Sequence, residues 1–197
     1  MLWIENMVQL TKIYTKGGDK GKTSLGTGER VLKNTTRIDA IGHVDELNAW
    51  MGVCILYCPK DHAEDLRRIQ HDLFDLGGDL CMPEQSQKKK LKILSSQVTW
   101  LEKEIDEQNK SLPPLSSFIL PGGTSVSSYL HLARTVARRA ERSVIALSQE
   151  TKINEEAIMY LNRLSDYLFV LCRTLNNKSV DDVLWIPGKN QMEVSKK

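Results

Sequence analysis

Apolar residues recur at steps of three and four along five separate stretches of the chain, and this spacing constrains the fold more than any other feature. The step matches the 3.6-residue turn of an α-helix, so each stretch predicts a helix with one buried face. The predicted helices span residues 37–58, 62–80, about 95–105, 124–149 and 154–177. Ser95 or Ser96 and Asn154 are the expected N-caps of the third and fifth helices. Only residues 12–15 and 183–186 are strand-like, and strands do not alternate with helices. We therefore expect an all-α, five-helix bundle preceded by an ordered, glycine-rich N-terminal arm.

The composition is that of one ordinary domain. The chain has 197 residues, of which 41% are hydrophobic and 26% charged, and its 27 Lys and Arg residues nearly balance 25 Asp and Glu residues. A net charge of +2 favours neither nucleic acid nor a membrane surface as a partner, so any anion site must be local. The longest uncharged stretch, residues 111–133, holds three prolines and does not predict a membrane-spanning helix.

The ends of the chain and its cysteines carry further expectations. We expect residues 1–11 to be an N-terminal extension, residues 12–188 a single domain and residues 189–197 a C-terminal tail. The first ten residues lack the basic, apolar and cleavage segments of an export signal, which predicts a cytoplasmic protein. The four cysteines lack Cys-x-x-Cys spacing and are expected to be reduced, and the four scattered histidines predict no metal site made of protein side chains.

Residues 15–24, TKGGDKGKTS, gather the glycines, lysines and hydroxyls that can surround a polyphosphate. They do not form a Walker A loop, because that motif needs a glycine at position 16, where the chain has Lys16. The loop is also followed by LGTG at 25–28 instead of an apolar helix. A phosphate-binding arm of another kind and a solvated tail both remain open.

Charged residues lie beside the predicted apolar faces of the two longest helices. On the fourth helix, Arg134, Arg138 and Arg142 follow one another at steps of four, with Glu141 among them. Like charges at this spacing repel, so they indicate either a solvated face paired with Glu141 or a phosphate bound by guanidinium groups. The fifth helix places four residues at the margin of its leucine stripe, where they predict interhelical hydrogen bonds or a site: Asn162, Asp166, Phe169 and Arg173.

The first predicted helix carries polar residues within and beside its apolar face. Asn48 lies within the apolar arc and Asp45 at its edge, so both are expected to seek donors from a neighbouring helix or subunit. A buried Asp45 would be a suitable partner for Arg134. His43 faces away and is interpreted as a surface or interface side chain.

Seven strings, in this order, closely resemble the PduO-type ATP:cob(I)alamin adenosyltransferase family: KIYTKGGDKGKTSL, TGERVLKN, GHVDELNAWMG, FILPGG, LHLARTVARRAER, YLNRLSDYLFVLCR and VLWIPG. The resemblance runs from about residue 12 to residue 188. It implies an all-α five-helix bundle that assembles as a homotrimer, with each active site between adjacent subunits. It also implies transfer of the 5′-deoxyadenosyl group of ATP to the cobalt of reduced cobalamin, which yields adenosylcobalamin and triphosphate.

The resemblance assigns roles to individual residues. Those that match the family's ATP contacts are Thr15, Lys16, Gly17, Gly18, Thr23, Ser24, Lys33, Arg138, Arg139, Glu141, Arg142 and Asn162. Those that match residues near the corrinoid are Asp45, Phe118, Arg134, Asp166 and Phe169. Asp45 and Arg134 match a salt bridge between subunits. Phe118 matches the aromatic residue that covers the lower face of the corrin. The candidate catalytic residues are these three together with Arg138. Gly17 departs from the family, which usually has Thr or Asn there.

The resemblance further implies ATP, Mg²⁺ and cob(I)alamin or cob(II)alamin as cosubstrate, cofactor and substrate. A corrinoid reductase and an adenosylcobalamin-dependent enzyme are the implied protein partners. Cobalt in its +1 state is the nucleophile of this reaction, so the chain needs no Ser-His-Asp or Cys-His arrangement. A non-catalytic nucleotide or corrinoid sensor and a helical scaffold are the alternative functions.

Overall fold

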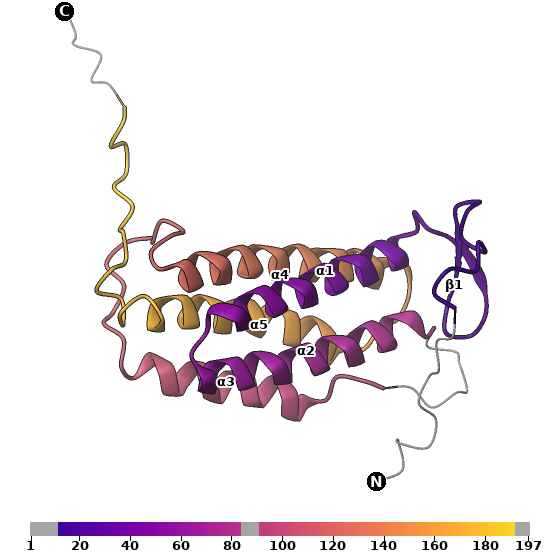
Figure 1. Ribbon diagram of the computed structural model, residues 1–197, viewed down its shortest axis with the longest axis horizontal. Helices are drawn as coiled ribbons and strands as arrows, with labels where there is room; N and C mark the ends of the chain where they lie inside the picture. Colours follow the sequence, from indigo (N-terminus) through magenta and orange to yellow (C-terminus); the bar gives the residue numbers. More distant parts are fainter. Residues whose placement is uncertain (1–11, 84–90, 192–197) are drawn as a thin grey trace, which may run out of the picture.

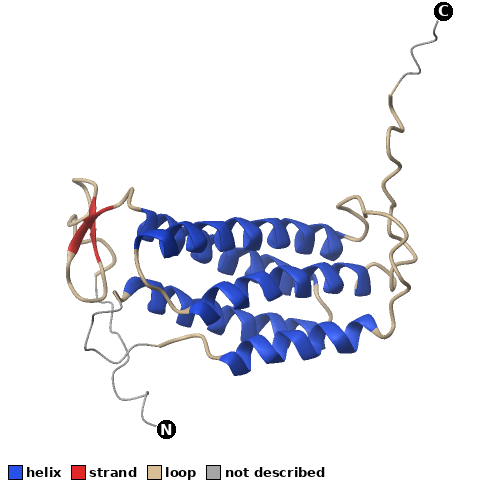
Figure 2. Cartoon of the chain, turned by 180° about the vertical axis from the view of Figure 1, so that it is seen from behind, coloured by secondary structure: helices blue, strands red, loops and turns tan. Residues whose placement is uncertain are grey.

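The structure, a computed structural model, describes residues 12–83 and 91–191 and contains five helices and one small sheet in these ranges. The helices form an elongated bundle, and the sheet lies beyond one end of it (Figures 1 and 2). The elements in chain order are β1 (Lys22–Ser24), β2 (Arg30–Leu32), α1 (Thr36–Tyr57), α2 (Lys60–Cys81), α3 (Ser95–Asn109), α4 (Ser125–Glu150) and α5 (Glu155–Thr174). The predicted all-α bundle is confirmed.

The core forms because the apolar stripes of the helices face one another. Helix α1 packs against α2 and α4, and α5 packs against α4 and α3. Leucines spaced along α2, such as Leu66, Leu73 and Leu76, are almost fully buried, as is Leu47 of α1. Each such side chain contributes about 1.5 to 3 kcal/mol through burial, so the stripes rather than the loops stabilise the bundle.

Helices α1 and α4 run antiparallel, and contacts at both ends fix this arrangement. At one end the rings of Tyr57 and Tyr129 lie with their centroids 4.7 Å apart. At the other end the Thr36 hydroxyl donates a hydrogen bond to the Glu150 carboxylate. The 26 residues of α4 make it about 39 Å long, so the start of α1 and the start of α4 lie far apart.

The helix starts depart from the sequence prediction in their hydrogen bonds. Thr124 caps α4, since its hydroxyl oxygen accepts a hydrogen bond from the Ser127 N–H at 3.2 Å. The side chain of Asn154 makes no capping hydrogen bond; its amide donates to Asp79 and to the Ile93 carbonyl at 3.0 and 2.9 Å. Asn154 nevertheless occupies the predicted N-cap position of α5. The prediction of a serine N-cap for α3 was wrong, because the residue before this helix is Leu94.

The extended segments also differ from the prediction. Residues 12–15 form no strand; β1 and β2 pair antiparallel instead, with Lys22 opposite Leu32 and Ser24 opposite Arg30. Three-residue strands are too short to leave a period-2 pattern, so the sequence did not reveal them. Residues 183–186 are extended and form one antiparallel bridge, between Leu184 and Ile119. The predicted N-terminal extension and the last six residues of the predicted tail lie outside the described residues.

Candidate active site

The glycine-rich arm, residues 12–34, is folded around Arg30, which the sequence analysis did not single out. The Arg30 guanidinium donates hydrogen bonds to the carbonyl oxygens of Gly17 and Lys22 and to the Ser24 hydroxyl, the last two at 3.1 and 3.2 Å. Buried Leu25 and a hydrogen bond from the Gly26 N–H to the Cys81 carbonyl at 3.0 Å join the arm to the end of α2. The arm therefore has a defined fold beside the bundle.

The arm brings together residues predicted to bind ATP. A Cβ atom added to Gly18 would lie 2.9 Å from the Lys33 ammonium nitrogen, so this cation rests against the Gly18 backbone. Lys16 adopts a left-handed conformation, with φ of 59°. Exposed ammonium groups beside a glycine-rich turn can bind an anion. All seven predicted ATP contacts of the arm lie in this region: Thr15, Lys16, Gly17, Gly18, Thr23, Ser24 and Lys33.

A second polar cluster lies between α4 and α5. The Asn162 amide donates a hydrogen bond to Glu141 at 3.0 Å, and Arg163 donates to the Asn162 side-chain oxygen at 2.8 Å. Partial burial raises the pKa of Asp166, and the nearby Glu141 carboxylate adds to this rise, while the Arg163 and Arg138 charges oppose it. The structure thus brings Arg138 and Glu141 of α4 together with Asn162 and Asp166 of α5.

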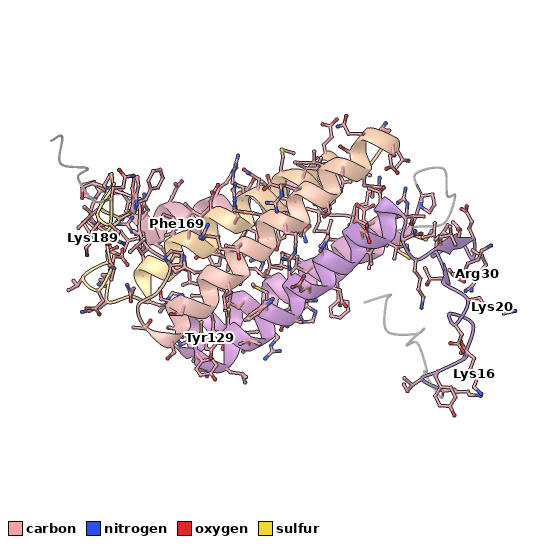
Figure 3. The ribbon with its side chains drawn as sticks, turned by 90° about the horizontal axis from the view of Figure 1, so that it is seen from above. Lys16, Lys20, Arg30, Tyr129, Phe169 and Lys189 are labelled. Atoms are coloured by element: carbon pink, nitrogen blue, oxygen red, sulfur yellow. The ribbon has the colours of Figure 1, made fainter. Side chains whose placement is uncertain are left out.

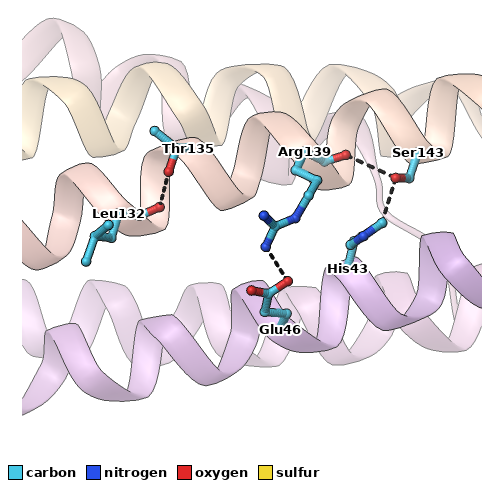
Figure 4. A network of polar contacts seen from close by, with 6 residues as sticks. All are labelled: His43, Glu46, Leu132, Thr135, Arg139 and Ser143. Carbon is cyan, nitrogen blue, oxygen red and sulfur yellow. Dashed lines mark hydrogen bonds and ion pairs between the residues drawn. The ribbon is translucent and has the colours of Figure 1, made fainter.

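Arg138 and Arg142 are exposed on α4, and within the described residues neither makes a hydrogen bond or an ion pair. Arg139 differs, because its guanidinium pairs with Glu46 of α1 (Figure 4). The contact of Arg139 with ATP stays a prediction, as do the other ATP contacts.

His43 contributes to the same α1–α4 contact. The sequence analysis interpreted it as a surface or interface side chain and did not predict its contact with α4. Its ring nitrogen Nδ1 lies 2.6 Å from the Ser143 hydroxyl oxygen, and that hydroxyl also lies 3.2 Å from the Arg139 carbonyl oxygen (Figure 4). The side chain is half-buried between the two helices. No sequence signal pointed to this pair, because its members lie 100 residues apart.

Asp45 and Arg134 are not paired within the protomer. Asp45 is exposed, contrary to the possibility that it is buried, and makes no hydrogen bond or ion pair with any described residue. Arg134 is half-buried, and its Nε atom is buried without a hydrogen-bond partner among the described residues. Asp45 lies on an apolar groove of about 510 Å³ between α1 and α2, which Ile41 and Phe74 also line.

Two predicted corrinoid residues, Phe118 and Phe169, lie toward the end of the bundle that is far from the arm. Phe118 precedes α4 and its side chain is 78% exposed. Phe169 of α5 makes an edge-on contact with the buried ring of His131, with centroids 6.4 Å apart. Burial and, to a lesser extent, the nearby Arg134 charge lower the pKa of His131, which favours the neutral form of this ring, although Asp182 opposes the shift.

The residues of the arm are separated from Phe118 and Phe169 by much of the length of the bundle. Lys16 and Arg30 lie at one end, and Phe169 and Lys189 lie toward the other (Figure 3). The long helices between them set this distance. One protomer therefore does not bring its own arm to its own Phe118.

The part of the chain that the structure describes holds neither a candidate metal site nor a candidate membrane span. Within residues 12–83 and 91–191, no three His, Cys, Asp or Glu side chains lie together in a way that could hold a metal ion. In the same ranges, no helix has the length and apolar character needed to cross a membrane. All four cysteines are free, and burial raises the pKa of the Cys58 thiol to about 11.

The chain is similar to known proteins over most of its length. Residues 13–175 match the family model described as cobalamin adenosyltransferase. A cobalamin adenosyltransferase of Cupriavidus metallidurans is 47% identical over 180 residues, which cover 90% of this chain and 95% of that one. A corrinoid adenosyltransferase of Bacillus subtilis is 43% identical over 173 residues, which cover 85% of this chain and 88% of that one.

The fold is also similar to solved structures. A variant of a PduO-type ATP:corrinoid adenosyltransferase from Lactobacillus reuteri, complexed with cobalamin and ATP, has a TM-score of 0.85 and 40% sequence identity with this chain. The match covers 88% of this chain and 99% of that one. Another variant of the same enzyme, complexed with ATP, has a TM-score of 0.83 at 40% identity, and covers 89% of this chain and all of that one.

Proposed function

The chain belongs to the cobalamin adenosyltransferase family, and from this premise we propose how its residues divide the work of the reaction. It is an ATP:corrinoid adenosyltransferase, which transfers the 5′-deoxyadenosyl group of ATP to the cobalt of reduced cobalamin and releases triphosphate. Cobalt in its +1 state attacks C5′ of the ribose, a cobalt–carbon bond forms, and the C5′–O bond breaks with its electron pair leaving on the triphosphate. No protein side chain serves as nucleophile.

Cationic side chains of the arm and of α4 hold the triphosphate. Negative charge grows on the leaving group in the transition state, so cations fixed around it lower the barrier. Lys16 and Lys33 supply this charge from the arm, and Arg138 and Arg142 supply it from α4. Neither arginine makes a hydrogen bond or an ion pair with a described residue, which leaves their guanidinium groups available to phosphate oxygens.

Magnesium accompanies the nucleotide. Phosphate oxygens are the hard ligands that Mg²⁺ prefers, so the triphosphate would hold the ion. Bound there, it neutralises part of the leaving group's charge. The hydroxyls of Thr23 and Ser24 lie on the arm that contacts this group.

A complete site needs two protomers, and the observation that carries this proposal is the separation of the arm from Phe118 along the bundle. A second copy that places its α4 against the groove beside Asp45 offers Arg134 to that carboxylate. The Asp45 carboxylate and the Arg134 guanidinium each lack a hydrogen-bonded or ion-pair partner within the described part of one chain. Because a half-buried guanidinium group is more stable beside an anion, the carboxylate of a second copy is a suitable partner for it. We take the assembly to be a homotrimer, in which three equivalent contacts of this kind close a ring.

Phe118 covers the lower face of the corrinoid. Its ring is exposed and therefore free to contact a flat, largely apolar ligand, with Phe169 and Asp166 near the same pocket. A ring in that position excludes the lower axial ligand, and four-coordinate cobalt in the +2 state is easier to reduce. A corrinoid reductase supplies the electron, and an adenosylcobalamin-dependent enzyme receives the product.

We place the reaction in the cytoplasm. Free cysteines fit a reducing compartment, since paired thiols are expected only where disulfides persist. We also take residues 12–188 as one functional domain, with 1–11 and 189–197 as its extension and tail.

The activity is tested by mixing the protein with ATP, Mg²⁺, cobalamin and a strong reductant and recording the visible spectrum. The adenosylcobalamin spectrum should appear and should depend on ATP and on protein. A protein that binds both compounds but never yields this spectrum would be a sensor, and the proposed function would be wrong.

A further inference from the structure

The segment that carries Phe118 is paired with the segment that follows α5. The Trp185 N–H donates a hydrogen bond to the Phe118 carbonyl at 2.7 Å, and the Leu120 N–H donates to the Val183 carbonyl at 2.8 Å. The Ser117 hydroxyl donates to the Trp185 carbonyl at 2.8 Å. Residues 117–120 and 183–186 therefore form a short antiparallel ribbon, which we call the terminal ribbon.

The ribbon places Phe118 and Trp185 on the same face. Ile119 pairs with Leu184, so the next pair along the ribbon is Phe118 opposite Trp185, and opposite residues project to the same side. The two ring centroids lie 6.0 Å apart at an interplanar angle of 56°. This tilted geometry is favourable for aromatic pairs. Trp185, at 43% exposed, thus supports one side of the more exposed Phe118 ring.

A buried ion pair anchors both halves of the ribbon to the end of α5. Arg173 and Asp182 have side chains that are only 5% and 6% exposed, with a nitrogen–oxygen distance of 3.5 Å. Arg173 also donates a hydrogen bond to the Pro113 carbonyl at 2.6 Å, and Asn176 donates to Asp182 at 2.8 Å. Arg173 thereby holds the segment before Phe118 and the segment before Trp185 at once, which keeps the two rings together.

We propose that Trp185 is a positioning residue that holds the ring of Phe118 in the orientation that covers the lower face of the corrinoid. The inference rests on the role proposed above for Phe118. An exposed phenylalanine without a neighbour populates several rotamers, and only those directed at the corrinoid displace the lower ligand. Packing against Trp185 restricts that choice before the substrate arrives, which is preorganisation of the site.

The test compares Trp185→Ala, Trp185→Phe and Phe118→Ala with the wild-type protein. Val180→Ala is the matched control, because Val180 is an exposed apolar residue of the same C-terminal segment and lies outside the ribbon. Each variant is assayed for adenosylcobalamin formation, for ATP affinity by calorimetry and for its unfolding midpoint. Electron paramagnetic resonance of bound cob(II)alamin, with ATP present, measures the fraction of four-coordinate cobalt.

Trp185→Ala should lower kcat by about three- to tenfold, the range expected when one aromatic contact is lost. The four-coordinate fraction should fall with it, while ATP affinity stays unchanged and the variant remains folded at the assay temperature. Trp185→Phe should recover most of both losses, since it restores a ring, and Val180→Ala should behave like wild type. The double variant lacking both rings should be no slower than Phe118→Ala alone, because Trp185 acts through Phe118.

Other results would overturn the inference in distinguishable ways. If Phe118→Ala loses the four-coordinate signal and Trp185→Ala keeps it, Trp185 has no positioning role, although the proposed function stands. If the two losses simply multiply in the double variant, Trp185 acts on the corrinoid independently. Should Trp185→Ala unfold, Trp185→Leu, which keeps an apolar side chain but has no ring, replaces it both as the single variant and in the double variant, and the same outcomes decide the matter. A wild-type protein that forms no adenosylcobalamin would instead refute the proposed function itself.

Discussion

Replacing Arg138 by alanine tests whether the exposed face of α4 stabilises the transition state. Arg138 makes no hydrogen bond or ion pair with a described residue, so the fold loses no contact when its guanidinium is removed. The loss should therefore fall on catalysis. Removing one donor from a preorganised charge-stabilising site costs about 2 to 4 kcal/mol, which corresponds to a fall in kcat/KM for ATP of about 30- to 900-fold.

Two further variants make the Arg138 result specific. Arg138→Lys keeps the charge but loses the planar fork, so its activity should lie between those of wild type and Arg138→Ala. Arg67→Ala removes an exposed arginine of α2 that is hydrogen-bonded to Gln70 at 3.1 Å, and kcat/KM should be unchanged. The assay is the rate of adenosylcobalamin formation with ATP varied, alongside thermal unfolding. The reasoning is refuted if Arg138→Ala keeps wild-type kcat/KM, or if its loss of activity follows a matching loss of stability.

Three other variants probe stability in the bundle, each by chemical denaturation. Tyr160→Phe deletes the buried hydroxyl that donates to Asp72 at 3.0 Å and should lower the free energy of unfolding by about 1.5 to 3 kcal/mol; no change would show that this hydrogen bond is dispensable. Gly123→Ala should lower the free energy of unfolding by about 1 to 3 kcal/mol, because φ at this residue is +97° and the new Cβ would lie 2.1 Å from the Asn176 side-chain oxygen. A variant as stable as wild type would contradict that geometry. Burial raises the pKa of Asp166 in the folded protein, so the wild-type protein loses stability as the pH rises from the unfolded-state pKa to the folded-state pKa. Asp166→Asn cannot ionise, so its stability relative to wild type should increase with pH over this range. A decrease would show that the pKa shift has the opposite sign.

Sequence periodicity predicted the helices because their burial pattern is local. The predicted range 62–80 contains most of α2, Lys60–Cys81, and the predicted start of α4 is one residue from the observed Ser125. Gly77 and Gly78 lie within α2, although glycine disfavours the interior of a helix. Their effect on the helix depends on the packing of neighbouring elements, which periodicity does not encode.

Several features that the sequence alone did not predict depend on contacts between residues that are not neighbours along the chain. Asn154 has the identity of an N-cap, but its amide bonds to Asp79, which lies 75 residues earlier. Arg30 organises the arm through carbonyl oxygens, and any residue type provides such acceptors. The pairing of Phe118 with Trp185 requires that α4 and α5 first bring two loops together. The residue roles near ATP and the corrinoid came from the family resemblance, and they stay predictions.

Mixing two inactive variants tests most directly whether a site is shared between protomers. Lys16→Ala removes a cation of the arm, and Arg138→Ala removes one of α4. The two proteins are unfolded together, refolded at equal concentration and assayed for adenosylcobalamin formation. If each site combines the arm of one protomer with α4 of the next, about one quarter of the sites in randomly mixed rings contain both residues, and activity should rise to about that share of wild type. A mixture no more active than the two separate variants would show that each protomer builds its whole site alone, and would contradict the account.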